Sequence, residues 1–174
     1  MDINANEKEN LLLSILAWSH VAHMTSRDWA VENGTDVNQI LHQSAFPTIL
    51  VTAASEYEPD TVQYLLEVGA DPALRVNSGF WSALVAAAFS GRCHACRFLL
   101  RQKGVYANRG HRGFFPDAFY AAVSGHLDYL SMDEDDRRYG IWDLEARLGC
   151  TRDWPEHRTV IRLLLASYLY LPNF

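Results

Sequence analysis

Small apolar residues and aromatic residues recur along this chain with a fixed period. Successive copies lie 34 residues apart, in the alanine pairs at 53–54, 87–88 and 121–122 and in Phe46, Phe80 and Phe114. A fixed period of this length predicts one helical unit that is used several times in a row. We therefore expect an all-α repeat protein.

The clearest unit contains the pattern of two short helices. Residues 48–54 predict the first helix, in which the small alanines let a second helix approach closely. Val62, Leu65 and Leu66 recur at helical spacing and place an apolar stripe on the second helix. Residues 69–72, Gly-Ala-Asp-Pro, end that helix, because glycine adopts a left-handed cap and proline prevents continuation. Each unit is thus expected to form two antiparallel helices.

This unit resembles the ankyrin repeat, whose pattern is roughly T-P-L-H-x-A-A, then G-H-x-x-V-V, then L-L and G-A-D. Residues 125–128, Gly-His-Leu-Asp, are similar to the turn G-H-L-E between the two helices of a repeat. The resemblance implies an ankyrin-like helical solenoid of antiparallel helix pairs, with about four repeats over residues 10–130. Its copies cover residues 48–71, 82–104, 118–128 and, in a degenerate form that ends at 34–38, an earlier segment.

The repeat pattern breaks after residue 130. Residues 133–138, Asp-Glu-Asp-Asp-Arg-Arg, replace the expected apolar helix, and a charge run of this kind is usually a solvated loop. Residues 141–149 predict a short amphipathic helix, and residues 160–165 resemble the second helix of a repeat. A terminal unit of a solenoid must cover the apolar edge of its neighbour. Residues 131–174 are therefore expected to form a divergent helical C-terminal cap.

Composition narrows the classes of partner. The chain has 174 residues, 49% of them hydrophobic, which predicts one folded domain over residues 1–174. Its formal charge of −6 provides no positive field for a nucleic-acid backbone, so we expect no nucleic-acid partner. No apolar run reaches the roughly 20 residues of a membrane helix, and we expect no membrane partner. Three cysteines are too few for a secreted disulfide framework, so we expect a cytoplasmic protein, with the nucleus as the open alternative.

Two cysteines and two histidines are spaced as in some metal sites, but their positions in the sequence do not favour a metal site. Cys93 and Cys96 have the spacing of a zinc or redox pair, but Cys96 occupies an apolar position of the second helix. His20 and His23 share one helical face without a third ligand. His126 matches a residue that the ankyrin family has at its turn. We therefore expect neither a metal nor a cofactor.

The aromatic residues before each first helix are the unusual feature of the chain. Phe46, Phe80 and Phe114 replace the small hairpin residue of the ankyrin pattern, and we expect them to pack between neighbouring hairpins. Trp81 and Phe115 follow one residue later, on what we expect to be the more exposed side. Because aromatic residues dominate interface hot spots, these two are expected to bind a partner.

The resemblance implies an intracellular, non-catalytic interaction module that binds a protein partner through its concave face and hairpin tips. A structural or inhibitory subunit would use the same surface. The family's variable surface positions correspond here to Trp81, Phe89, Ser90, Arg112, Phe115, Val123 and Ser124.

A second hypothesis belongs to another class of protein. The aromatic residues, 12% of the chain, would line a pocket in the concave face of a small-molecule-binding protein or a cofactor-independent enzyme. His111, Asp117 or Tyr120 would then supply the proton transfer of an isomerase- or cyclase-type reaction. The sequence contains no P-loop, G-x-G-x-x-G, G-x-S-x-G or H-E-x-x-H motif. We favour the non-catalytic interpretation and leave the question of enzymatic activity open.

Overall fold

The computed structural model describes residues 36–40, 46–56, 59–77, 79–108, 110, 114–131 and 156–170. Within these ranges the chain forms six α-helices and no strand, as the repeat pattern predicts. The helices are α3 (Ile49–Glu56), α4 (Pro59–Glu67), α5 (Ala83–Phe89), α6 (Cys93–Leu100), α7 (Ala118–Ser131) and α9 (His157–Tyr170). The predictions for His20, His23, the charge run at 133–138 and the helix at 141–149 lie outside the described residues.

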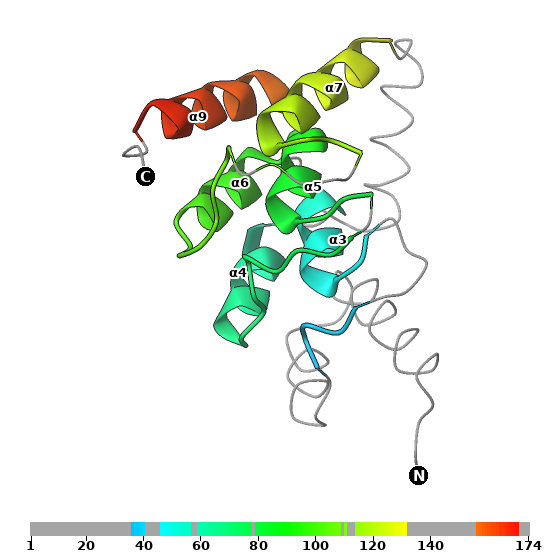
Figure 1. Cartoon of the computed structure of the whole chain (residues 1–174), viewed down its shortest axis with the longest axis vertical. Helices are drawn as coiled ribbons and strands as arrows, with labels where there is room; N and C mark the ends of the chain where they lie inside the picture. Colours follow the sequence, from blue (N-terminus) through cyan, green and yellow to red (C-terminus); the bar gives the residue numbers. More distant parts are fainter. Residues whose placement is uncertain are drawn as a thin grey trace.

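The helices form two layers (Figure 1). Helices α3, α5 and α7 pack side by side in one layer, and α4, α6 and α9 lie in the other. Each helix of the first layer also pairs with a helix of the second, α3 with α4, α5 with α6 and α7 with α9, and α9 contacts α5 as well. The stacked helix pairs are those of a helical solenoid.

Each helix of the first layer begins at a capping side chain. Thr48, Ser82 and Asp117 each accept a hydrogen bond from the backbone N–H three residues later, at 3.2, 3.3 and 2.8 Å. Such a cap satisfies one of the backbone N–H groups that have no partner within the helix, and it stabilises the helix by about 1 kcal/mol. These short polar residues therefore define where α3, α5 and α7 start.

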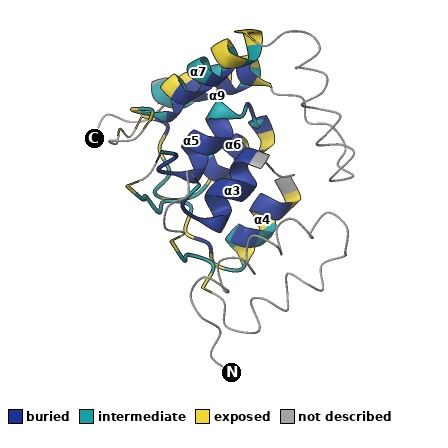
Figure 2. Cartoon of the chain, turned by 90° about the vertical axis from the view of Figure 1, so that its right-hand side faces the viewer, coloured by how far each residue is buried: buried dark blue, intermediate teal, exposed yellow. Residues whose placement is uncertain are grey.

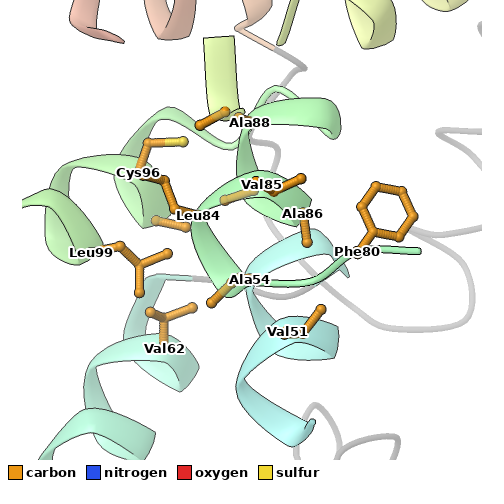
Figure 3. Packing of buried hydrophobic residues seen from close by; sticks show 14 of the residues in the cluster. Val51, Ala54, Val62, Phe80, Leu84, Val85, Ala86, Ala88, Cys96 and Leu99 are labelled. Atoms are coloured by element: carbon orange, nitrogen blue, oxygen red, sulfur yellow. The ribbon is translucent and has the colours of Figure 1, made fainter. Parts of the chain in front are cut away.

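The core is made largely of alanine. Residues 83–88 of α5 are all buried, because α3 and α7 pack against opposite sides of this helix (Figure 2). Small side chains permit this close approach of three helices. Between the two layers, Val62 and Leu99 approach each other from α4 and α6, and Cys96 is fully buried nearby (Figure 3). The prediction that Cys96 is a buried structural residue is confirmed.

A polar side chain joins the end of one unit to the end of the next. Gly69 has the left-handed φ of 98° that was predicted for a helix cap, and Ala70 N–H donates to the carbonyl of Leu65 at 2.8 Å. Asn38 binds this turn from the preceding unit: its amide donates to Gly69 O at 3.1 Å, and its Oδ1 accepts from Asp71 N–H at 2.7 Å. The G-A-D ending of the repeat is thus also a contact between units.

The last copy departs from the predicted pattern. Residues 125–128 were expected to form the turn between two helices, and this prediction is wrong, because α7 continues through them to Ser131. Gly91, the equivalent glycine one unit earlier, has a φ of 68° and does form a turn. Gly125 instead serves close packing, since a Cβ atom there would overlap the carbonyl oxygen of Phe89. The helix that pairs with α7 is α9, after residues 132–156.

Candidate protein-binding surface

Five phenylalanines form a cluster beside the first layer of helices. The ring of Phe80 is its centre and stacks on Phe46, with ring centroids 5.0 Å apart and planes 6° from parallel. Phe89 and Phe115 lie 5.3 and 5.8 Å from Phe80, and Phe114 meets it edge-on at 6.2 Å. The prediction that Phe46 and Phe80 pack between neighbouring units is confirmed.

Phe114 contacts this cluster, but its ring faces mostly solvent. The side chain is 69% exposed, so the prediction that it packs inward is wrong. The rings of Phe46 and Phe80 are each covered by the phenylalanine of the next unit, whereas Phe114 ends this series among the described residues. Its position is nevertheless defined. The N–H of Phe114 donates to Gly79 O at 3.2 Å, and its ring lies so close to Gly79 that a Cβ atom there would overlap it.

Trp81 is buried. Only 3% of the residue is exposed, so the prediction that it lies on the exposed side and contacts a partner is wrong. Its indole N–H donates to Phe115 O at 2.8 Å, and the guanidinium of Arg75 lies 5.5 Å from its ring. The indole therefore joins the loop before α5 to the loop before α7, which leaves its ring no exposed face.

Two other predicted contact residues, Phe89 and Phe115, belong to this cluster. Phe89 and Phe115 are half-buried and stack on each other with centroids 5.1 Å apart. Ser90 ends α5, where its N–H donates to Ala86 O at 3.0 Å. Val123 and Ser124 are half-buried on α7, and Arg112 lies outside the described residues. For these positions a role in binding stays a prediction.

The residues predicted for proton transfer are not gathered into a reacting pair in the part of the chain that is described. Asp117 uses Oδ1 to cap α7 and Oδ2 to accept a hydrogen bond from the hydroxyl of Tyr168 at 2.8 Å. Burial, together with the hydrogen bond to Asp117 and the charge of that carboxylate, raises the pKa of Tyr168 to about 12. Tyr120 is 56% exposed, and His111 lies outside the described residues. Asp117 thus acts as a structural link between α7 and α9.

The outward side of α7 carries an apolar face that was not predicted from the sequence. Tyr120, Leu127 and Leu130 are 56%, 60% and 49% exposed, and half-buried Val123 lies between them at helical spacing. The spacing of 3, 4 and 3 residues is the signal that would have found this face. It was missed because residues 125–128 were interpreted as a turn.

The two thiols of α6 are enclosed and free. Burial raises the pKa of Cys96 far above its usual range. Burial also raises the pKa of Cys93, an effect that Arg97 opposes and Glu156 reinforces. In the described part of the chain, no three His, Cys, Asp or Glu side chains come together as a metal site would require. None of the described helices combines the length and the apolarity that crossing a bilayer demands.

Comparison with known families identifies the helix pairs. A family model of ankyrin repeats, in three copies, matches residues 27–111. This part of the chain is an ankyrin-repeat array. The three copies include α3 to α6, whereas α7 and α9 lie beyond the match, so a fourth unit and the extent of 10–130 stay predictions. No curated protein matches the chain.

The ankyrin repeats suggest a general role for the surface that carries the aromatic cluster. Arrays of this kind stack their units into an extended surface, and ankyrin repeats generally mediate protein–protein interaction. In this array the loops before α5 and α7 are held together by Trp81, Phe114 and Gly79. The loop edge is therefore a preformed surface rather than a set of independent loops.

Proposed function

We propose that this ankyrin array binds a protein partner through a surface made by the tip of the loop before α7 and the outward face of α7. We call it the tip–α7 surface. The observation that carries the proposal is the exposed, anchored ring of Phe114. The surface consists of Phe114, Tyr120, Val123, Leu127 and Leu130.

The anchoring of Phe114 is favourable for binding. An aromatic ring that is already ordered loses little conformational freedom when a partner covers it, so more of the burial energy appears as affinity. Buried aromatic anchors of interfaces typically cost about 2 kcal/mol or more when truncated. Phe114 has this character, because the backbone hydrogen bond to Gly79 and the contact with Phe80 hold its ring in one place.

The charge around this surface supports one kind of partner. Asp117 lies at the start of α7 and exposed Asp128 lies next to Leu127, in a chain with a formal charge of −6. A partner that presents apolar side chains flanked by lysine or arginine would complement both features. The partner expected here is a basic, apolar segment of another protein.

Two further inferences concern the setting of this function. We infer that α9, with the rest of residues 131–174, caps the array, which is supported by the packing of α9 on α6 and α7 and by the full burial of Val160 and Leu164. We also infer a cytoplasmic location, supported by the free thiols of Cys93 and Cys96.

The test is quantitative capture of proteins from a cell lysate by the immobilised chain. Phe114→Ser removes the exposed ring, and Leu165→Ser, on α9, is the matched control because Leu165 is also apolar and 45% exposed. Proteins that bind through the tip–α7 surface should be retained by the wild type and the control and lost with Phe114→Ser. Equal retention by all three chains would overturn the proposal, provided that thermal unfolding shows both variants folded.

A further inference from the structure

The first-layer helices end in carbonyl groups that receive a donor from the next unit. The carbonyl of Ser55, near the end of α3, accepts a hydrogen bond from Nε of Arg92 at 3.1 Å. One repeat later the equivalent carbonyl, that of Phe89 in α5, accepts a hydrogen bond from Nε2 of His157 at 2.8 Å. An arginine is always charged, whereas a histidine changes charge near neutral pH. The attachment of α9 therefore depends on a titratable group.

The hydrogen bond identifies which ring nitrogen of His157 donates. A carbonyl oxygen can only accept, so Nε2 carries a proton, and in the neutral ring Nδ1 is the bare nitrogen. His157 is 4% exposed, and its Nδ1 is buried with no hydrogen-bond partner in the described part of the chain. Nδ1 of His126, on α7, is likewise buried and unpartnered, and the two rings lie 5.7 Å apart between centroids. A second proton on His157 would meet no acceptor among the residues that the structure describes.

The groups around His157 do not favour a positive charge. Arg92 faces it from the turn before α6, and His126 and Tyr129 face it from α7, with the Tyr129 ring centroid 5.9 Å away. The carboxylate of Glu156, which precedes His157 in the chain, is engaged with the Cys93 thiol of α6. His157 is also the first residue of α9, where the partial positive charge of the helix dipole opposes a cation.

We propose that the His126–His157 pair makes the docking of α9 acid-sensitive, so that protonation of His157 releases α9 from α5 and α7. Release uncovers the apolar surface that Val160 and Leu164 now bury against the neighbouring helices. The units built on α3 to α6 stay folded, because Arg92 is charged at any physiological pH and continues to donate its hydrogen bond to the carbonyl of Ser55. The end of the array would thus offer an additional apolar surface only in a mildly acidic environment.

The direction of the effect follows from burial. Burial lowers the pKa of His157, the Phe89 carbonyl opposes this, and the charges of His126 and Arg92 lower it further. Docked α9 therefore binds a proton less readily than released α9. Docking is at full strength above the ordinary histidine pKa of about 6.5, and it weakens by up to about tenfold per pH unit below that value until the lowered pKa is reached.

Amide hydrogen exchange measures this docking segment by segment. In the wild type, protection of α9 relative to α5 should fall at least about fivefold between about pH 7.5 and about pH 5.5, after correction for the intrinsic exchange rate. The variant His157→Gln keeps an N–H group for the Phe89 carbonyl but does not titrate, and its α9 should keep the same relative protection at both pH values. An equal loss in both chains, or no loss in the wild type, would overturn the proposal.

A second measurement uses the unmodified chain, in case the variant fails to fold. The ring resonances of His157 are followed by NMR as a function of pH. A titration midpoint below about 6.5 supports the proposal, and a midpoint at or above that value contradicts it.

Discussion

Trp81 and Phe115, which are 34 residues apart, are joined by a hydrogen bond of 2.8 Å from the indole N–H to the backbone carbonyl. The bond lies where two neighbouring repeats meet, and the indole that makes it is buried. Trp81 and Phe115, two of the residues that the sequence predicted to bind a partner, thus form part of the contact between repeats. The exposed aromatic of this edge is Phe114.

The contribution of this bond is measured by Trp81→Phe. The substitution keeps an aromatic ring but leaves the Phe115 carbonyl without its donor, and an unsatisfied buried group typically costs about 1–3 kcal/mol. We expect the free energy of unfolding in urea to fall by an amount in this range. Arg75→Ala, which removes the guanidinium beside the ring together with its aliphatic stem but keeps the indole hydrogen bond, should cost less, about 0.5–1 kcal/mol. A larger loss with Arg75→Ala than with Trp81→Phe would contradict this account.

Local signals in the sequence predicted much of the fold. Ser82 caps α5 and Gly69 takes a left-handed conformation because of interactions within a few residues, and the 34-residue period transfers these features from one unit to the next. The predictions that are wrong concern residues whose positions depend on contacts with residues distant in the sequence. Gly125 and Gly91 occupy equivalent positions, yet the approach of Phe89 O to Gly125 gives it a packing role within a continuous helix. Trp81 is buried because the loop of the next repeat covers it.

The packing role of Gly125 leads to a prediction with an unusual sign. Within a helix, Gly→Ala normally stabilises by up to about 1 kcal/mol. Here the added Cβ would overlap the Phe89 carbonyl oxygen, so Gly125→Ala should destabilise by about 1–3 kcal/mol. Ser124→Ala, at the neighbouring half-buried position, is the control and should change stability by less than about 0.5 kcal/mol. A stabilised Gly125→Ala variant in thermal or urea unfolding would show that α5 and α7 do not approach this closely.

Asp117 should contribute to stability through two hydrogen bonds. Asp117→Ala removes both the cap of α7 and the acceptor of the Tyr168 hydroxyl, and we expect a loss of about 2 kcal/mol. Tyr168→Phe removes only the second bond and should cost about 1 kcal/mol. The double variant should lose less stability than the sum of the two single losses, because both single variants remove the same hydrogen bond between Tyr168 and Asp117. Additive losses would mean that Asp117 and Tyr168 act independently.

The hydrogen bond between Tyr168 and Asp117 also predicts that the stability of the fold depends on pH in the alkaline range. The pKa of Tyr168 is raised to about 12 in the folded chain, above the ordinary tyrosine value of about 10. The contribution of this hydroxyl is therefore complete below about pH 10 and is lost as the pH rises toward 12. Urea unfolding from neutral pH to about pH 11 should show a smaller decline in stability for Tyr168→Phe than for the wild type. Parallel declines would contradict the assignment.

Cys93 and Cys96 are predicted to be inert in the folded protein. Both are buried, and the pKa of each thiol is raised mainly by burial, so little reactive thiolate is present at neutral pH. After brief alkylation of the native protein, peptide mass spectrometry should find both side chains unmodified, and alkylation in denaturant should modify both. Rapid native modification of Cys96 would mean that α6 does not enclose it.

The proposed role of Phe114 as an anchor for a protein partner is tested by the affinity for a partner recovered by capture. Titration of that partner with purified wild type, Phe114→Ser and Leu165→Ser gives three dissociation constants. We expect Phe114→Ser to weaken binding at least about tenfold, or about 1.4 kcal/mol, and Leu165→Ser to leave the affinity within about twofold of the wild type. Equal affinities for all three folded chains would contradict it.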